Sequence, residues 1–264
     1  MDFSRFWVMD GGNSTLHFGE FRGPQLQDQW RLPSHPVLPE PEYQALLAAQ
    51  VAQRGTPQGV VFCSVFKAPL PALEAALASL GIPVLEIGQK ELEQVGFRVL
   101  AQGAGIDRLV NGYAAWQKWK RDLVVVDLGT ATTFDVVASP GVFLGGAIFT
   151  GLELCAKALA QNAEALFEVP LEFPKQIIGK NTREALQSGI LFGYSSLVET
   201  MLEKIAASHG ATLFGIATGG LAHVLYDQTA HLDRWEPTLT LEGLAGLAQD
   251  ERINGNLKPR VGHG

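Results

Sequence analysis

The segment Asp127-Leu128-Gly129-Thr130-Ala131-Thr132-Thr133-Phe134-Asp135 directly follows an apolar run at residues 123–126. A related segment, Met9-Asp10-Gly11-Gly12-Asn13-Ser14-Thr15, follows apolar residues 6–8, about half a chain earlier. Each pattern predicts a buried strand that ends in a carboxylate, then a tight turn of Gly, Ser or Thr, then a second strand. Such a duplicated unit suits a nucleotide held between two similar lobes. The carboxylate can hold a metal ion or its water, while N–H groups and hydroxyls bind phosphate oxygens.

Composition indicates a well-packed globular α/β protein. The chain has 264 residues, 47% of them hydrophobic and 18% charged, with 29 glycines. This length allows one large domain or two of roughly 120–140 residues. The formal charge of −7, from 20 basic and 27 acidic side chains, comes with scattered Lys and Arg. We therefore expect no nucleic-acid partner and no anionic membrane surface, so that phosphate binding must come from local donors.

The two cysteines and the first residues of the sequence indicate the cellular compartment of the protein. Cys63 and Cys155 lie alone in apolar contexts, which predicts reduced thiols and neither a disulfide nor a metal pair. No basic region followed by an apolar stretch opens the sequence, and no apolar run reaches ~18 residues. These features predict a cytoplasmic protein without a membrane span.

Hydrophobic periodicity predicts two halves of similar plan. Strands are expected at 6–10, 15–20, 29–32, 59–65, 83–87, 123–127, 132–138, 141–148 and 215–220. Helices are expected at 41–54, 70–80, 107–120, 151–166, 181–208, from 221 and at 242–252, with a short element at 239–241. The predicted lobes are residues 1–118 and 119–255, followed by a frayed polar tail at 256–264.

Each acidic loop also has a plain structural interpretation. Residues 10–14 could be an ordinary hairpin turn, because Gly and Asn favour positive φ. Residues 127–135 could be a polar turn with threonines on a sheet face. Three threonines and a glycine between two aspartates nevertheless favour anion binding in the second loop. Asp10, Asp127 and Asp135 suit hard cations, which prefer oxygen ligands.

Further motifs stand at predicted helix starts and strand ends. Gly105-Ile106-Asp107-Arg108 opens a helix, where Asp107 could be a simple first-turn acid or a base towards a substrate hydroxyl, and Arg108 could fork onto a carboxylate. Thr182 fits the N-cap of the helix near 181–208. The Gly pair in Thr218-Gly219-Gly220 could let backbone approach a flat ligand such as a purine. The sequence has no Walker-type phosphate loop.

Six segments, taken in order, resemble the motifs of the type III pantothenate kinases, a family of the acetate and sugar kinase/Hsc70/actin superfamily. In the first half, D-x-G-N-[TS] matches Asp10, Gly12, Asn13 and Ser14, and G-x-D-R-x-x-N matches Gly105, Asp107, Arg108 and Asn111. In the second half, D-x-G-T-A-T-T-x-D matches Asp127, residues 129–133 and Asp135, and G-G-x-I matches Gly145, Gly146 and Ile148. The motif G-x-N-T-x-x-A-x-x-S-G matches Gly179, Asn181, Thr182, Ala185, Ser188 and Gly189, and T-G-G-x-A matches Thr218, Gly219, Gly220 and Ala222.

This resemblance, over residues 10–252, implies an α/β fold of two ribonuclease-H-like, actin-like ATPase lobes around a nucleotide cleft. It implies ATP-dependent phosphorylation of pantothenate to 4′-phosphopantothenate, the first step of coenzyme A biosynthesis, by a homodimer with the pantothenate pocket at or near the subunit interface. It also implies roles for particular residues. Asp107 is then the general base, and pantothenate is bound by Gly105, Ile106, Asp107, Arg108 and Thr182. ATP is bound by Asp10, Gly11, Gly12, Asn13, Ser14, Thr15, Thr130, Gly219 and Gly220, with Mg²⁺ held by Asp10 through water and K⁺ or NH₄⁺ by Asp127.

The stretch 97–104 departs from the family, which carries a Tyr and then an Asn-Pro pair there. This departure motivates one alternative, a kinase of the same superfamily for another small alcohol. A second alternative is a non-catalytic regulator, since relatives of the family have been described as accessory transcription factors. The intact Asp10, Asp107 and Asp127 argue against a regulator, and the acidic charge balance argues against direct DNA contact.

Overall fold

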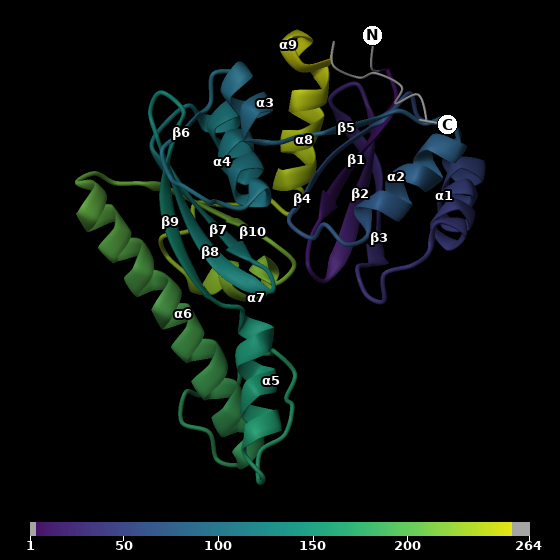
Figure 1. Cartoon of the computed structure of the whole chain (residues 1–264). Helices are drawn as coiled ribbons and strands as arrows, with labels where there is room; N and C mark the ends of the chain where they lie inside the picture. The colour runs from purple at the N-terminus through teal and green to yellow at the C-terminus, as the bar shows by residue number, and fades with distance from the viewer. Residues whose placement is uncertain (1–3, 255–264) are drawn as a thin grey trace. The chain divides into compact units, whose positions relative to one another are not determined.

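The computed structural model describes residues 4–254, which form a mixed α/β protein of two compact units (Figure 1). Of these residues, 4–117 and 239–254 make up the first unit, and 118–238 make up the second. Among the residues described, no helix combines the length and apolar character that crossing a bilayer requires. The predicted tail at 256–264 lies outside the described residues.

The first unit is built on a sheet with the strand order β3-β2-β1-β4-β5. The strands are β1 (Phe6–Gly11), β2 (Thr15–Arg22), β3 (Gln25–Pro33), β4 (Val60–Ser64) and β5 (Val84–Glu86). Strand β1 pairs antiparallel with β2 and parallel with β4, so that Asp10 lies opposite His17 on one side and Cys63 on the other. Because β1 is covered on both faces, it is apolar at successive positions instead of alternating.

Helices cover both faces of this sheet (Figure 1). The helices of this unit are α1 (Glu40–Arg54), α2 (Leu70–Ser79), α3 (Gln89–Gln94), α4 (Ile106–Trp119), α8 (Leu239–Gln249) and α9 (Glu251–Asn254), and the short strand β6 (Arg98–Val99) lies between α3 and α4 in the chain. On one face, Tyr43 of α1 and Leu73 of α2 join Trp7 and Met9 in a buried cluster. On the other face, α8 packs against β1, β2 and β4. The buried Asn111 of α4 accepts a 2.6 Å hydrogen bond from Thr240, which ties α4 to α8.

Helix α8 marks the main difference from the predicted organisation. The sequence-based division placed residues 239–255 in the C-terminal lobe, but packing groups α8 with the first unit. At Gly243 a Cβ would lie 2.9 Å from side-chain atoms of Val110 and Ala114, so the two helices approach closely. Residues 239–241, predicted as a separate element, form the first turn of α8.

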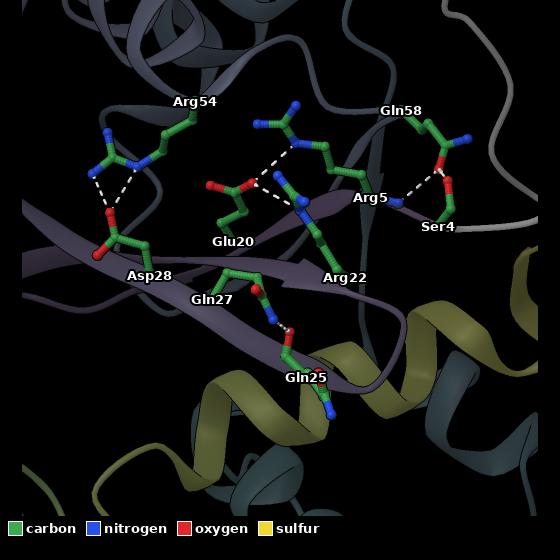
Figure 2. A network of polar contacts seen from close by, with 9 residues as sticks. All are labelled: Ser4, Arg5, Glu20, Arg22, Gln25, Gln27, Asp28, Arg54 and Gln58. Carbon is green, nitrogen blue, oxygen red and sulfur yellow. Dashed lines mark hydrogen bonds and ion pairs between the residues drawn. The ribbon is translucent and has the colours of Figure 1, made fainter.

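Charged side chains form a network over β2 and β3 (Figure 2). The carboxylate of Glu20, only 5% exposed, accepts a 2.9 Å hydrogen bond from Arg5 Nε and lies 4.0 Å from Arg22 Nε. Arg54, at the end of α1, donates through Nε and Nη2 to Asp28 Oδ2 on β3, at 3.1 and 2.6 Å. These contacts link a buried carboxylate and the edge strand to the rest of the unit.

The second unit repeats the plan of the first. Its elements are β7 (Leu123–Leu128), β8 (Ala131–Ala138), β9 (Val142–Thr150), α5 (Leu152–Asn162), α6 (Thr182–His209), β10 (Phe214–Thr218), α7 (Ala222–Leu225), a 3₁₀ turn (Tyr226–Gln228) and β11 (Arg234–Trp235). Within this unit, β11, β10, β7, β8 and β9 are neighbours in that order. Strand β7 pairs antiparallel with β8 and parallel with β10, as β1 does with β2 and β4, and Asp127 lies opposite Thr218. Figure 1 shows α5 beside one end of α6, beyond the sheet, while the rest of α6 runs along the sheet and packs on it.

The close spacing of β8 and β9 generates a stability prediction. At Gly146 a Cβ would lie 1.7 Å from the carbonyl oxygen of Phe134, so Gly146→Ala must force the strands apart. We expect this substitution to lower the free energy of unfolding by about 2–4 kcal/mol. Thermal unfolding checks the effect against Gly193→Ala in α6. A Cβ there meets no atom within 4 Å, and we expect it to be neutral or stabilising by up to about 1 kcal/mol. Equal melting temperatures for the two variants would contradict this prediction.

Candidate functional site

The loop after β1 is held tightly against the end of β4. A Cβ on Gly11 would lie 2.3 Å from Ser64 Oγ, so only glycine fits this position. The Gly11 carbonyl accepts from the Val65 amide at 3.0 Å, and Ser64 Oγ lies 3.0 Å from the same oxygen and 2.7 Å from the Phe66 carbonyl. The Gly12 amide donates to the Thr15 carbonyl at 3.0 Å and closes the turn. Asn13 and Ser14 are exposed, so their side chains stand on the outer side of the loop.

Asp10 lies half-buried at the end of β1, next to the thiol of Cys63. The Sγ atom of Cys63 donates to Asp10 Oδ1 at 3.8 Å, and the cysteine is free and fully buried. Burial raises the pKa of the Cys63 thiol, and the carboxylates of Asp10 and Asp107 raise it further. The thiol therefore stays protonated. The negative charges of Asp10 and Asp107 both raise the pKa of this one buried sulfur.

The helix start at Gly105-Ile106-Asp107-Arg108 belongs to the same unit as the Asp10 loop. A Cβ on Gly105 would lie 2.5 Å from Asp107 Oδ1 and 3.4 Å from Val65 at the end of β4. The Arg108 amide donates to Asp107 Oδ1 at 2.8 Å. Burial raises the pKa of the Asp107 carboxyl above its usual value, although the Arg108 amide and guanidinium oppose this shift. Asp107 is therefore a stronger base than an exposed aspartate.

In the second unit, Asp127 meets the turn that follows β10. A Cβ on Gly219 would lie 2.4 Å from Asp127 Oδ1, and Gly219 has a φ of +91°. Gly220 follows as an exposed residue. Thr130 is exposed at the tip of the loop between β7 and β8, and its carbonyl accepts from the Gly151 amide at 3.1 Å. The carboxylate and the two turns thus lie at one end of the sheet, where strand ends commonly bind ligands.

The other polar residues of the Asp127 loop point inward. Asp135, expected from the sequence to suit a cation, is fully buried and accepts a 2.8 Å hydrogen bond from Thr133 Oγ1. This burial indicates a structural role for the Asp135 carboxylate, and its suitability for a cation stays a prediction from the sequence. Thr132 Oγ1 lies 2.6 Å from the hydroxyl of Tyr194, which donates to the Thr150 carbonyl at 2.7 Å. No sequence pattern marked Tyr194, because its partners lie more than forty residues away.

The start of α6 differs from its predicted form. Asn181, and not Thr182, is the N-cap, because its side chain accepts from the Glu184 amide at 3.0 Å. Glu184 in turn accepts from the Lys180 amide at 2.8 Å. Thr182 is exposed in the first turn, twelve residues before Tyr194. Twelve residues of helix span about 18 Å, so Thr182 lies about that far along α6 from Tyr194, whose hydroxyl contacts Thr132.

Apart from Thr182, the predicted site residues thus form two groups, one within each unit. The loop at Asp10 and the helix start at Asp107 lie together in the first unit, and Asp127, Thr130, Gly219 and Gly220 lie together in the second. Among residues 4–254, no three His, Cys, Asp or Glu side chains gather closely enough to hold a metal ion by themselves. A cation at Asp10 or Asp127 would need water, carbonyl or phosphate oxygens as additional ligands.

Two sheets of the same strand plan, each with an acidic loop after its first strand, define the class of two ribonuclease-H-like lobes found in actin-like ATPases. Solved structures show the same fold. A Campylobacter jejuni protein described as a Baf family transcriptional activator has a TM-score of 0.57 and 21% identity, over 96% of this chain and all of that one. Component A of (R)-2-hydroxyglutaryl-CoA dehydratase from Acidaminococcus fermentans has a TM-score of 0.53 and 12% identity, over 92% and 96% of the two chains.

Sequence comparison identifies the family. Residues 6–204 match the family model described as type III pantothenate kinase. The type III pantothenate kinase of Frankia alni is 37% identical over 244 residues, which cover 90% of this chain and 96% of that protein. The chain belongs to the type III pantothenate kinase family.

Gly219 provides a test of the geometry around Asp127. In Gly219→Ala, the new methyl group must displace the Asp127 carboxylate, and the positive φ adds backbone strain. We expect kinase turnover to fall on the order of tenfold or more. Gly246→Ala in α8 is the matched control, because its Cβ meets no atom within 4 Å. Turnover by Gly219→Ala equal to that of the control would show that the Asp127 position does not matter.

Proposed function

We propose that this protein transfers the γ-phosphoryl group of ATP to the primary hydroxyl of pantothenate, giving 4′-phosphopantothenate, the first step of coenzyme A biosynthesis. The observation that carries the proposal is the half-buried Asp107, with its raised pKa, beside Arg108 at a helix start in the same unit as the Asp10 loop. Family membership supplies the substrate. Phosphoryl transfer depends mainly on alignment and charge neutralisation, which these groups suit.

In this proposal Asp107 accepts the proton of the attacking hydroxyl. Its burial favours that role, because a desolvated carboxylate with a raised pKa binds a proton more strongly. Arg108 pairs with the carboxylate of pantothenate through its planar fork of N–H donors. The backbone of Gly105 and Ile106 completes this side of the acceptor site.

The nucleotide is assigned to the two acidic loops. The family uses ATP, and a divalent cation is the usual partner of its phosphates. We assign Mg²⁺ to Asp10 through water, and the phosphates to residues 10–15, Thr130, Gly219 and Gly220. We further assign K⁺ or NH₄⁺ to Asp127. The half-buried carboxylate of Asp127 offers oxygen ligands, which hard cations prefer.

The proposal includes a homodimer in which the second copy supplies Thr182. Thr182 is exposed at the first turn of α6, about 18 Å along the helix from Tyr194. Large apolar side chains are exposed on α5 and on the segment before α6, at Leu154, Leu159, Phe167, Ile177 and Ile178. Exposed large apolar side chains in such numbers favour an interface, and the second copy is the occupant that the family resemblance implies. A cytoplasmic location remains a prediction from the sequence.

The decisive variant is Asp107→Asn, which keeps the shape of the side chain but removes the base. We expect turnover of pantothenate to fall by about 10²–10⁴-fold, while ATP binding stays close to that of the unmodified protein. A coupled ADP-release assay with pantothenate, run with and without K⁺, measures the first effect, and titration calorimetry with MgATP measures the second. Asp227→Asn, at an exposed carboxyl of the 3₁₀ turn, is the control.

Three outcomes would change the proposal. Near-normal turnover by Asp107→Asn would remove Asp107 from the mechanism. Phosphorylation of another small alcohol, but not of pantothenate, would favour the alternative kinase. No ATP turnover with any alcohol, together with binding of a specific partner, would favour the regulator.

The pH dependence follows from the same carboxyl. Asp107 must be deprotonated to accept the hydroxyl proton, so kcat/KM falls as the pH drops through the pKa of Asp107. Because burial raises that pKa, the loss begins at a higher pH than for an ordinary aspartate. A pH–rate profile checks this, with thermal unfolding at each pH to separate inactivation from unfolding. A profile with no acidic limb above the usual range of aspartate would contradict the expectation.

A further inference from the structure

A residue outside all the predicted motifs holds the loop after β1. Ser34 directly follows β3 and is fully buried. Its hydroxyl donates to the Gly12 carbonyl at 2.7 Å, and its amide donates to the Ser14 carbonyl at 3.1 Å. One buried residue, some twenty positions along the chain, therefore binds two carbonyls of the same short turn.

A second serine binds the preceding carbonyl of this turn. Ser64 Oγ lies 3.0 Å from the Gly11 carbonyl and shares its one proton between this oxygen and the Phe66 carbonyl at 2.7 Å. The Val65 amide also donates to the Gly11 carbonyl, at 3.0 Å. The carbonyls of Gly11, Gly12 and Ser14 thus all accept from buried or backbone donors. Their oxygens point towards the body of the unit, while the side chains of Asn13 and Ser14 are exposed.

The direction of these carbonyls matters for an anion. A carbonyl oxygen carries partial negative charge and repels a phosphate, whereas N–H groups and hydroxyls attract it. A glycine-rich turn has many backbone conformations, and some of them would turn a carbonyl outward. Bonds from buried donors exclude those conformations before the ligand arrives, which is the condition for preorganised electrostatic binding.

We propose that Ser34 is a positioning residue for nucleotide phosphate binding: its hydroxyl and amide hold the Gly12 and Ser14 carbonyls inward, so that the loop presents its donors to the phosphates. Ser34 acts through the loop and does not itself touch the nucleotide. This inference rests on the assignment of the Asp10 loop to ATP in the proposed function, but it does not depend on which alcohol accepts the phosphoryl group.

The test compares Ser34→Ala with Ser34→Thr, which keeps the hydroxyl, and with Ser79→Ala. Ser79 donates to the Ala75 carbonyl at 2.9 Å on the exposed side of α2, so its loss removes a similar bond far from the loop. For each protein, titration calorimetry gives the affinity for MgATP, thermal unfolding gives the stability, and the ADP-release assay gives both KM values. We expect Ser34→Ala to bind MgATP about 3–10-fold more weakly, as for one lost hydrogen bond. Its KM for the acceptor should stay unchanged, and Ser34→Thr and Ser79→Ala should bind normally.

Each contrary result has one meaning. Ser34→Ala that binds MgATP as tightly as Ser79→Ala would overturn the inference, and so would Ser34→Thr that binds as weakly as Ser34→Ala. A lower melting temperature without a change in affinity would show that Ser34 is only structural. Weakened MgATP binding in a protein that does not phosphorylate pantothenate would leave the inference standing and overturn the proposed acceptor. Absence of MgATP binding in the unmodified protein would overturn both.

Discussion

The contact on which the arrangement depends is the close approach of backbone at the ends of paired parallel strands. At the end of β1 and β4, Gly11 lies against Ser64; at the end of β7 and β10, Gly219 lies against the carboxylate of Asp127. Only a residue without a side chain permits either approach. Because both sheets use the same pairing, each unit places an acid at the equivalent strand end. The site chemistry is thus a consequence of strand pairing, to which the loops add their donors.

Much of both sheets could be predicted from the sequence, because β1 and β7 are apolar at successive positions and each carries an aspartate next to its last residue. The membership of α8 could not. Its apolar residues show that it is buried, but they do not say against which sheet, and more than one hundred residues separate it from its partner Asn111. The short helix α3 was not predicted, since only Leu92 among its residues is buried. The N-cap of α6 was misplaced by one residue, because Asn181 and Thr182 both have capping side chains.

Part of the candidate site could likewise be predicted from the sequence, and part of it could not. The order of the motifs singled out Asp10, Asp107, Asp127 and the glycines around them. Each motif is a run of neighbouring residues, so it can be recognised from the sequence alone. The supporting contacts are non-local: Cys63 beside Asp10, Ser34 under the loop, and Tyr194 between Thr132 and Thr150. Asp135 shows the limit of residue type. Its carboxyl group suggested a cation ligand, but residues 132–137 of β8 are all buried, so both faces of the strand are covered, and the sequence pattern gave this burial too little weight.

Because α8 packs on the first sheet although it is made late, the two units do not become complete in the order in which their synthesis begins. Strands β1, β2 and β4 leave the ribosome early, yet the helix that covers one of their faces is made only after residues 118–238. Once residue 238 has been made, the second unit has all of its residues, whereas the first unit still lacks α8. A nascent chain that stops before Leu239 would therefore have a complete second unit and a first sheet with one apolar face exposed to water. Such an exposed apolar face binds chaperones and promotes aggregation.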